Sequence, residues 1–227
     1  MKNTTSSEKK YYNSLTIFFT VLLLLSNLAE TKICNFFGCA IGAGTLIFPL
    51  LYVLSDVITE VYGFTDSRKT IWVGFGYSCF FSIFIYIVYL LPPSEHWHEQ
   101  EAFEKIFLVS PRIVFGSVIS YFVGEMLNTM IIAFLKVKFH GRYFALRAIF
   151  STFIGSSFES ILFGFIAFFG RIPTNELVKM IALLTLIKVL YEILIMPVTI
   201  KLIAYLKKIE GLNVYETPSL KGFWPKF

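Results

Sequence analysis

Residues 48–63 read FPLLYVLSDVITEVYG, an apolar run that carries two acidic side chains, Asp56 and Glu60. The two carboxylates are four positions apart, so they lie on one face of the run if it is helical. Inside a membrane each charged side chain costs about 2.5–3.5 kcal/mol on insertion scales. We therefore expect both to face the interior of a helical bundle, where a partner or a ligand can compensate them.

This run closes a longer apolar stretch, from Ile33 to Tyr62. At about 1.5 Å per residue, the stretch is too long for one straight membrane span. Pro49 lacks a backbone N–H and crowds the preceding helical turn, which predicts a kink or a break near residues 42–49. The spacing Gly38-x-x-x-Gly42 is interpreted as a helix-packing motif.

The composition of the whole chain also indicates a membrane protein. The chain has 227 residues, of which 56% are hydrophobic and 15% are charged, and its mean hydropathy is +0.70. A soluble domain has about 45–50% apolar and about 25% charged residues. These values exclude a nucleic-acid-binding protein, a disulfide scaffold and a soluble two-domain enzyme. The three cysteines form no C-x-x-C pair, and His96 and His98 have no third ligand nearby, so we expect no metal site.

Five further apolar stretches complete the predicted spans: 15–28, 70–91, 113–135, 145–169 and 177–206, the last bent at Pro197. A spanning helix uses about 20 residues, so the chain holds at most roughly seven to nine spans with loops, and the apolar stretches give six. The first is interpreted as an uncleaved helix rather than a signal peptide, because Asn27 suits a cleavage site poorly and further spans follow. We predict an all-α polytopic membrane protein, with a six-helix domain at 15–206 between tails at 1–14 and 207–227.

The basic residues predict the orientation of these spans. Fourteen Lys and Arg residues fall on the side that holds both termini, five fall on the other side, and Lys188 lies inside a span. Loops on the cytoplasmic side carry an excess of Lys and Arg. Both termini are therefore expected in the cytoplasm, with the chain crossing a bacterial inner membrane.

The loop at 92–111 places aromatic and aliphatic side chains among four glutamates. This pattern predicts a short amphipathic helix that lies on the outer membrane interface. An anchoring role is favoured over a gating role.

Eight polar residues within or at the ends of the spans are candidate substrate-binding residues: Asn27, Asp56, Glu60, Glu125, Asn128, Glu159, Lys188 and Glu192. Glu125 and Glu159 have long apolar flanks on either side, so we assign them to a ligand or proton pathway. Lys188 and Glu192 are four apart and equally compatible with an ion pair within one helix. Asp56 and Glu60 are also compatible with positions near a membrane surface.

Motifs for catalysis do not occur in the sequence. It contains no H-E-x-x-H, no G-x-S-x-G, no phosphate-binding loop and no Cys/His pair placed for nucleophilic attack. Neither catalytic residues nor a cofactor are expected, and a carrier of a small solute is favoured over an enzyme.

The run FPLLYVLSDVITEVYG resembles the most recognisable stretch of the VUT family of vitamin-uptake and queuosine-precursor transporters. The resemblance covers roughly residues 15–210 and extends to four further blocks: Asn27–Lys32, QEAFEKIF with Gly124-Glu125-Met-Leu-Asn128, Arg147 with Ser151-Thr152 and Glu159, and Lys188-Val-Leu-Tyr-Glu192 with Pro197. An aspartate is commoner in the family at the position of Glu159.

The resemblance implies a six-helix carrier, with a fold similar to the substrate-binding subunits of energy-coupling vitamin transporters. It implies a small-molecule cargo, 7-cyano- or 7-aminomethyl-7-deazaguanine or a related deazapurine. A self-sufficient secondary carrier is favoured, and the alternative is a substrate-binding subunit of an ATP-driven transporter. The expected partners are the cargo and the lipid bilayer, with no nucleic acid, and oligomerisation stays open.

Glu125, Asn128 and Glu159 are expected to form one polar cluster. The short loop between the fourth and fifth spans makes these spans antiparallel neighbours. A guanine-type edge presents adjacent N–H donors, and one carboxylate can accept both of them. We therefore predict that this cluster reads the hydrogen-bonding edge of the cargo.

Overall fold

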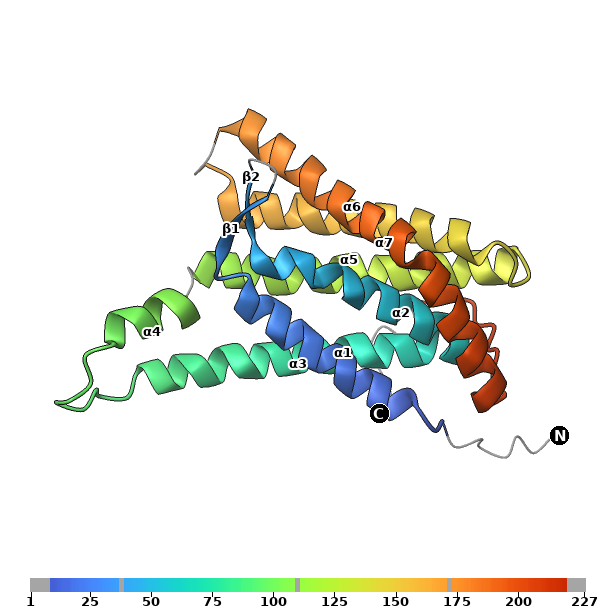
Figure 1. Ribbon diagram of the computed structural model, residues 1–227, viewed down its shortest axis with the longest axis horizontal. Helices are drawn as coiled ribbons and strands as arrows, with labels where there is room; N and C mark the ends of the chain where they lie inside the picture. Colours follow the sequence, from blue (N-terminus) through green and yellow to red (C-terminus); the bar gives the residue numbers. More distant parts are fainter. Residues whose placement is uncertain (1–8, 37–38, 109–110, 171–172, 220–227) are drawn as a thin grey trace.

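The computed structural model describes residues 9–36, 39–108, 111–170 and 173–219 (Figure 1). Its elements are α1 (Tyr12–Ala29), β1 (Ile33–Phe36), β2 (Cys39–Gly42), the 3-10 helix η1 (Ala43–Leu46), α2 (Phe48–Tyr62), α3 (Phe64–Tyr89), α4 (Gln100–Phe107), α5 (Pro111–Lys138), α6 (Phe144–Phe168) and α7 (Thr174–Glu210). In this part of the chain, six segments are long and apolar enough to cross a membrane: α1, η1 with α2, α3, α5, α6 and α7. The predicted all-α fold with six spanning helices is confirmed.

The six segments run alternately in opposite directions through one bundle (Figure 1). We call the end where α1 begins and α7 ends the terminal end, and the end with β1 and β2 the hairpin end. Large apolar side chains cover the outside, among them Phe80 at 64%, Ile83 at 60% and Leu194 at 80% exposure. An apolar outer surface of this kind suits contact with lipid.

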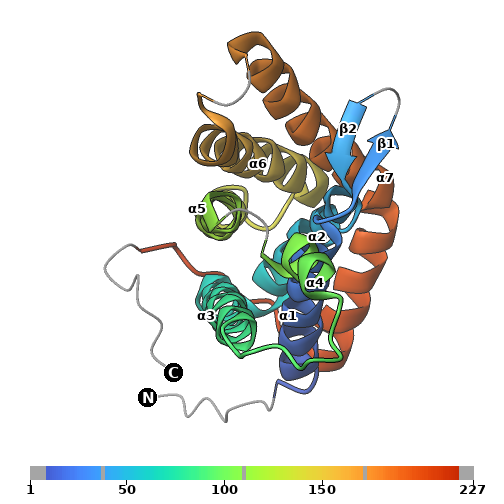
Figure 2. The ribbon, with the colours of Figure 1, turned by 90° about the vertical axis from the view of Figure 1, so that its left-hand side faces the viewer.

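The central helix of the bundle is α2, as the end-on view shows (Figure 2). All its residues except Leu50 are buried, and it packs against α1, α3, α5 and α7. A helix that is buried all round presents every polar side chain to other helices rather than to lipid. Asp56 and Glu60 therefore lie inside the bundle.

The break predicted near residues 42–49 is present. The described residues before it form strands, and not the helix that the packing motif implied. Residues 33–36 and 39–42 form two antiparallel strands, in which Ile33 pairs with Gly42 and Cys34 with Ile41. Gly42 leaves room for a carboxylate, since a Cβ atom there would lie 2.1 Å from Glu30 Oε1. The helix-packing interpretation is thus wrong for Gly42, and Gly38 lies outside the described residues.

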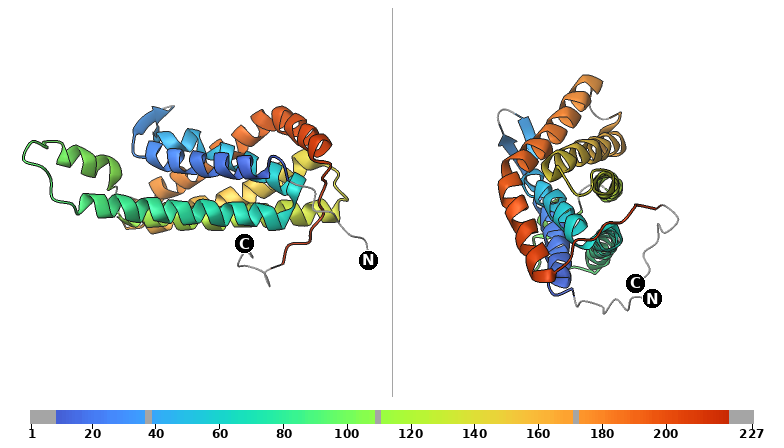
Figure 3. Two further views of the ribbon diagram at one scale, coloured as in Figure 1. Left: turned by 90° about the horizontal axis from the view of Figure 1, so that it is seen from below. Right: turned by 90° about the vertical axis from the view of Figure 1, so that its right-hand side faces the viewer.

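The loop after α3 contains the expected short helix, α4, which stands apart from the bundle (Figures 1 and 3). None of its residues is buried. Its place at a membrane interface stays a prediction.

The chain turns back after α7 and crosses the terminal end. Gly211 ends α7 in the left-handed conformation, at φ +64°. The backbone N–H of Val214 donates to the Val61 carbonyl at 3.3 Å, and Glu216 Oε2 accepts from the Thr65 N–H at 2.7 Å. The segment 211–219 is thus fastened to the junction between α2 and α3.

Candidate functional site

A cavity opens between helices in the half of the bundle nearer to the hairpin end. The space between its walls and across its open mouth is roughly 440 Å³, of which about 40 Å³ can hold the centre of a water molecule. Its lining comes from α1, η1, α2, α5, α6 and α7: Glu30, Thr45, Phe48, Ser117, Ser120, Glu159, Ser160, Phe163, Leu184 and Lys188. Two of the eight candidate residues, Glu159 and Lys188, are in this lining.

Glu159 and Lys188 form an ion pair between α6 and α7, with Lys188 Nζ 2.7 Å from Glu159 Oε1. The Tyr52 hydroxyl donates to the other oxygen, Glu159 Oε2, at 2.5 Å. The three side chains therefore connect α2, α6 and α7 at the cavity wall. Lys188 pairs across helices and not with Glu192, so the ion pair within α7 that the sequence also allowed is not formed.

Glu30, at the end of α1, is the second carboxylate of the cavity. Its Oε1 accepts from the Thr45 hydroxyl at 3.4 Å, and its Oε2 has no hydrogen-bond partner among the described residues. Burial raises the pKa of the Glu30 carboxyl above its ordinary value. The hydroxyls of Ser120 and Ser160, in the same lining, are also without described partners. The cavity wall thus contains buried hydrogen-bonding atoms that have no partner among the described residues.

Four candidate residues lie deeper and do not line this cavity: Asp56, Glu125, Asn128 and Glu192. The Asn128 amide donates to Asp56 Oδ1 at 2.7 Å. Both oxygens of Glu125 and both of Glu192 have no hydrogen-bond partner among the described residues. Glu125 and Glu159 interact electrostatically, so the expected neighbourhood of the fourth and fifth spans is present, with Asp56 and Glu192 added to it.

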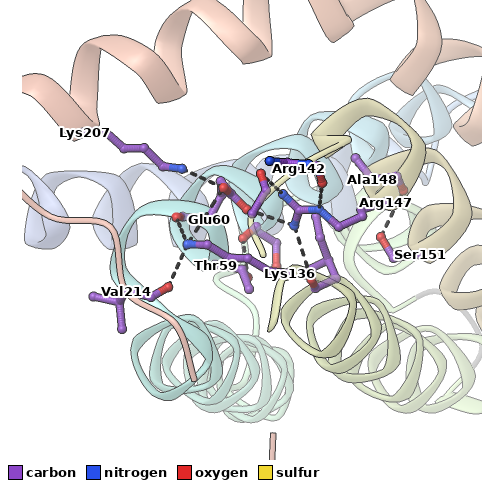
Figure 4. A network of polar contacts seen from close by, with 12 residues as sticks. Thr59, Glu60, Lys136, Arg142, Arg147, Ala148, Ser151, Lys207 and Val214 are labelled. Carbon is purple, nitrogen blue, oxygen red and sulfur yellow. Dashed lines mark hydrogen bonds and ion pairs between the residues drawn. The ribbon is translucent and has the colours of Figure 1, made fainter. Parts of the chain in front are cut away.

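Glu60 lies in a separate network at the terminal end of α2 (Figure 4). Its Oε2 accepts from Arg147 Nη1 at 3.0 Å, and its Oε1 is 2.6 Å from Lys207 Nζ and 3.8 Å from Lys136 Nζ. Lys136 also donates to the carbonyls of Glu60 and Val214. One carboxylate therefore joins α2, α5, α6 and α7 to the segment 211–219.

Asn27 is half-buried near the end of α1 and is not in the cavity lining. The structure thus divides the eight candidates into cavity wall, deep interior, terminal-end network and this isolated position.

Several residues of these sites were not among the candidates. Glu30 falls within the Asn27–Lys32 block of the resemblance and Tyr52 within the run at 48–63, but neither was singled out. Lys136 and Lys207 entered only the count of basic residues that predicts the orientation, and Arg147 entered that count and one block of the family resemblance. Charges at the ends of predicted spans, opposite an acidic residue in another span, are the signal that could have identified them.

Comparisons with known proteins agree with a transport role for this architecture. The model of a family described as "putative vitamin uptake transporter" matches residues 42–202. The chain is also similar to the "probable queuosine precursor transporter" of Bacillus subtilis strain 168, with 26% identity over 173 residues, which is 76% of each chain. No solved structure gives a significant match, so the expected likeness to energy-coupling subunits stays a prediction.

Proposed function

Because the chain belongs to the putative vitamin uptake transporter family, and is therefore a membrane transporter rather than an enzyme, we propose that its cargo is a queuosine precursor. The proposed cargo is 7-cyano- or 7-aminomethyl-7-deazaguanine or a related deazapurine, and the chain carries it without an ATPase partner. The name of the Bacillus subtilis relative supports this class of cargo.

The observation that carries the proposal is the unused Glu30 oxygen in the cavity. A carboxylate accepts two adjacent N–H donors of a guanine-type edge, as it does with arginine. The serine hydroxyls of the lining offer further hydrogen bonds, and the rings of Phe48 and Phe163 offer faces for stacking. Glu159 is held by Lys188 and Tyr52, so it shapes the wall. Glu30 Oε2 is buried and has no partner among the described residues, so we assign the donor edge of the cargo to Glu30.

The proposed orientation of the bundle in the membrane follows from the charges. Lys136, Arg147 and Lys207 lie at the terminal end with most other basic residues, which favours a cytoplasmic position for that end. The cavity then faces the outside. A cysteine at His96 should react with an impermeant thiol reagent added outside, whereas one at Arg142 should not; the reverse pattern would contradict this orientation.

Binding to the purified protein tests the cargo and the site together. Glu30→Gln replaces one acceptor with a donor, so the affinity for 7-cyano-7-deazaguanine should fall at least about tenfold. Glu176→Gln, on the exposed part of α7, should leave the affinity unchanged. Equal affinities of the wild type and Glu30→Gln would show that Glu30 does not bind the cargo.

Reconstitution of the chain alone into liposomes tests the mode of action. Exchange of labelled 7-cyano-7-deazaguanine across the vesicle membrane without ATP is expected for a self-sufficient carrier. Binding without exchange would instead indicate a subunit that needs an ATP-driven partner.

A further inference from the structure

Three buried carboxyl groups come together in the deep interior, Asp56 on α2, Glu125 on α5 and Glu192 on α7. We call them the acid triad. Asp56 and Glu125 are 0% exposed, and Glu192 is 1% exposed. Asp56 interacts electrostatically with both glutamates, and the two glutamates interact with each other.

No cation of the described residues forms an ion pair with the acid triad. Lys188 is paired with Glu159, and the three cations of the terminal end surround Glu60. Fully ionised, the triad would hold three like charges in a medium of low dielectric constant, where each is expensive and each repels the others. At least part of the triad must therefore carry protons in this conformation.

The groups that face the triad come from every helix packed on α2. The ionisable ones are Tyr52 and Glu60 on α2, Tyr121 on α5, Glu159 on α6 and Lys188 on α7. From α3 comes the Ser67 hydroxyl, bonded to Ser55 and Thr129, while α1 contributes apolar side chains and η1 has no ionisable residue.

The triad lies deeper than the cavity, and none of its residues is in the cavity lining. Five of its six carboxyl oxygens have no hydrogen-bond partner among the described residues and essentially no surface that a water molecule could touch. The sixth, Asp56 Oδ1, accepts from Asn128, whose own Oδ1 is also without a described partner. The ligand that needs no volume and satisfies such acceptors is the proton.

We propose that the acid triad is a proton-binding site that couples cargo movement to the proton gradient. Glu125 interacts with both Glu159 and Lys188, which line the cavity. At this level α5 and α6 touch, since a Cβ atom at Gly124 would lie 2.6 Å from Glu159 Cβ. A proton gained or lost by the triad therefore changes the field at the cavity wall. The proposal rests on the proposed function, because it supplies the driving ion of that carrier.

Transport by the purified chain in liposomes tests the coupling. A pH gradient of one unit, acidic outside, should accumulate 7-cyano-7-deazaguanine up to about tenfold per proton, and a protonophore should abolish the accumulation. The variant Asp56→Asn/Glu125→Gln/Glu192→Gln should keep exchange without a gradient but lose accumulation, while Glu176→Gln should keep both. Exchange that ignores the pH gradient, or responds only to sodium, would overturn proton coupling and leave the proposed function standing.

A second measurement needs no cargo. At neutral pH the wild type should show the infrared carbonyl band of protonated carboxyl groups, and the triple variant should lose most of it. An identical band in both proteins would show that the triad holds no proton. If the wild type shows the band but exchanges no deazaguanine, the proposed function fails while the proton site stands.

Discussion

Two carboxylates one helical turn apart on α2 have opposite surroundings. Glu60 is held by three cations within 3.8 Å, whereas Asp56 shares its region with two further carboxyl groups and one amide. The two residues have nearly the same burial, 2% and 0% exposed. Burial therefore does not distinguish the carboxylate of the Glu60 network from the carboxyl group that we assign to proton binding, whereas the sign of the neighbouring charges does.

The largest effect is expected when Glu60 is changed to Gln. Two of its cations, Lys136 and Arg147, are fully buried, and removing one partner of a buried ion pair costs about 3–5 kcal/mol. The free energy of unfolding, measured on purified protein in detergent, should fall by that amount.

The matched control is Glu176→Gln, which breaks an exposed pair with Lys179 on α7. Exposed pairs contribute about 0–1 kcal/mol. A loss of stability in Glu60→Gln no larger than in Glu176→Gln would show that the network does not hold the terminal end together.

Exchanging Lys188 and Glu192 should have the next largest effect. The exchange puts a carboxylate beside Glu159 and a lysine into the acid triad. Affinity for 7-cyano-7-deazaguanine should fall at least about tenfold, or about 1.4 kcal/mol, because the cavity wall loses its ion pair. The exchange of Glu176 and Lys179 on the same helix should change nothing. Full transport by the variant in which Lys188 and Glu192 are swapped would show that the two residues only neutralise each other.

Asp56→Asn should change the free energy of unfolding by less than about 1 kcal/mol, because the new amide oxygen still accepts from Asn128 and no cation loses a partner. The same unfolding assay as for Glu60→Gln measures it. A destabilisation as large as that of Glu60→Gln would show that Asp56 stabilises the fold as much as Glu60 does, and would contradict the comparison.

The smallest expected effect is a change in pH dependence from Glu30. Burial raises the pKa of this carboxyl in the folded protein, so the folded state keeps a proton that the unfolded state releases. Its contribution to stability is therefore largest below the unfolded value, about 4.3, and declines as pH rises toward the folded value. Glu30→Gln should make the unfolding free energy less dependent on pH over this range. An unchanged pH dependence would show that the pKa of Glu30 does not differ between the folded and the unfolded protein.

The helical architecture followed from apolar runs whose length matches a membrane, and this signal is local. The strands at 33–36 and 39–42 were missed because their residues are as apolar as those of a span, and hydropathy does not separate a short strand from a helix. Gly42 at the end of β2 and Gly44 in η1 leave space for the Glu30 carboxylate.

The pairing of charges depended on contacts that the sequence does not contain. Spacing showed that Lys188 and Glu192 share a helix face, but the helix packing decided that Lys188 faces Glu159. Likewise, the shared face of Asp56 and Glu60 was predictable, whereas the cations around Glu60 come from α5, α6 and α7. Positions within one helix could be predicted, and partners between helices could not.

The Glu60 network also has a consequence for biosynthesis. The chain is made from its N-terminus, so α2 leaves the ribosome before any of its cationic partners exists. Lys136, Arg147 and Lys207 follow Glu60 by 76, 87 and 147 residues. The second span therefore carries an uncompensated carboxylate until α5 supplies Lys136 and α6 supplies Arg147, and the network is complete only when α7 supplies Lys207. A nascent chain that stops before α7 lacks Lys207, so a defect in the last span removes an ion pair of Glu60 in the second span.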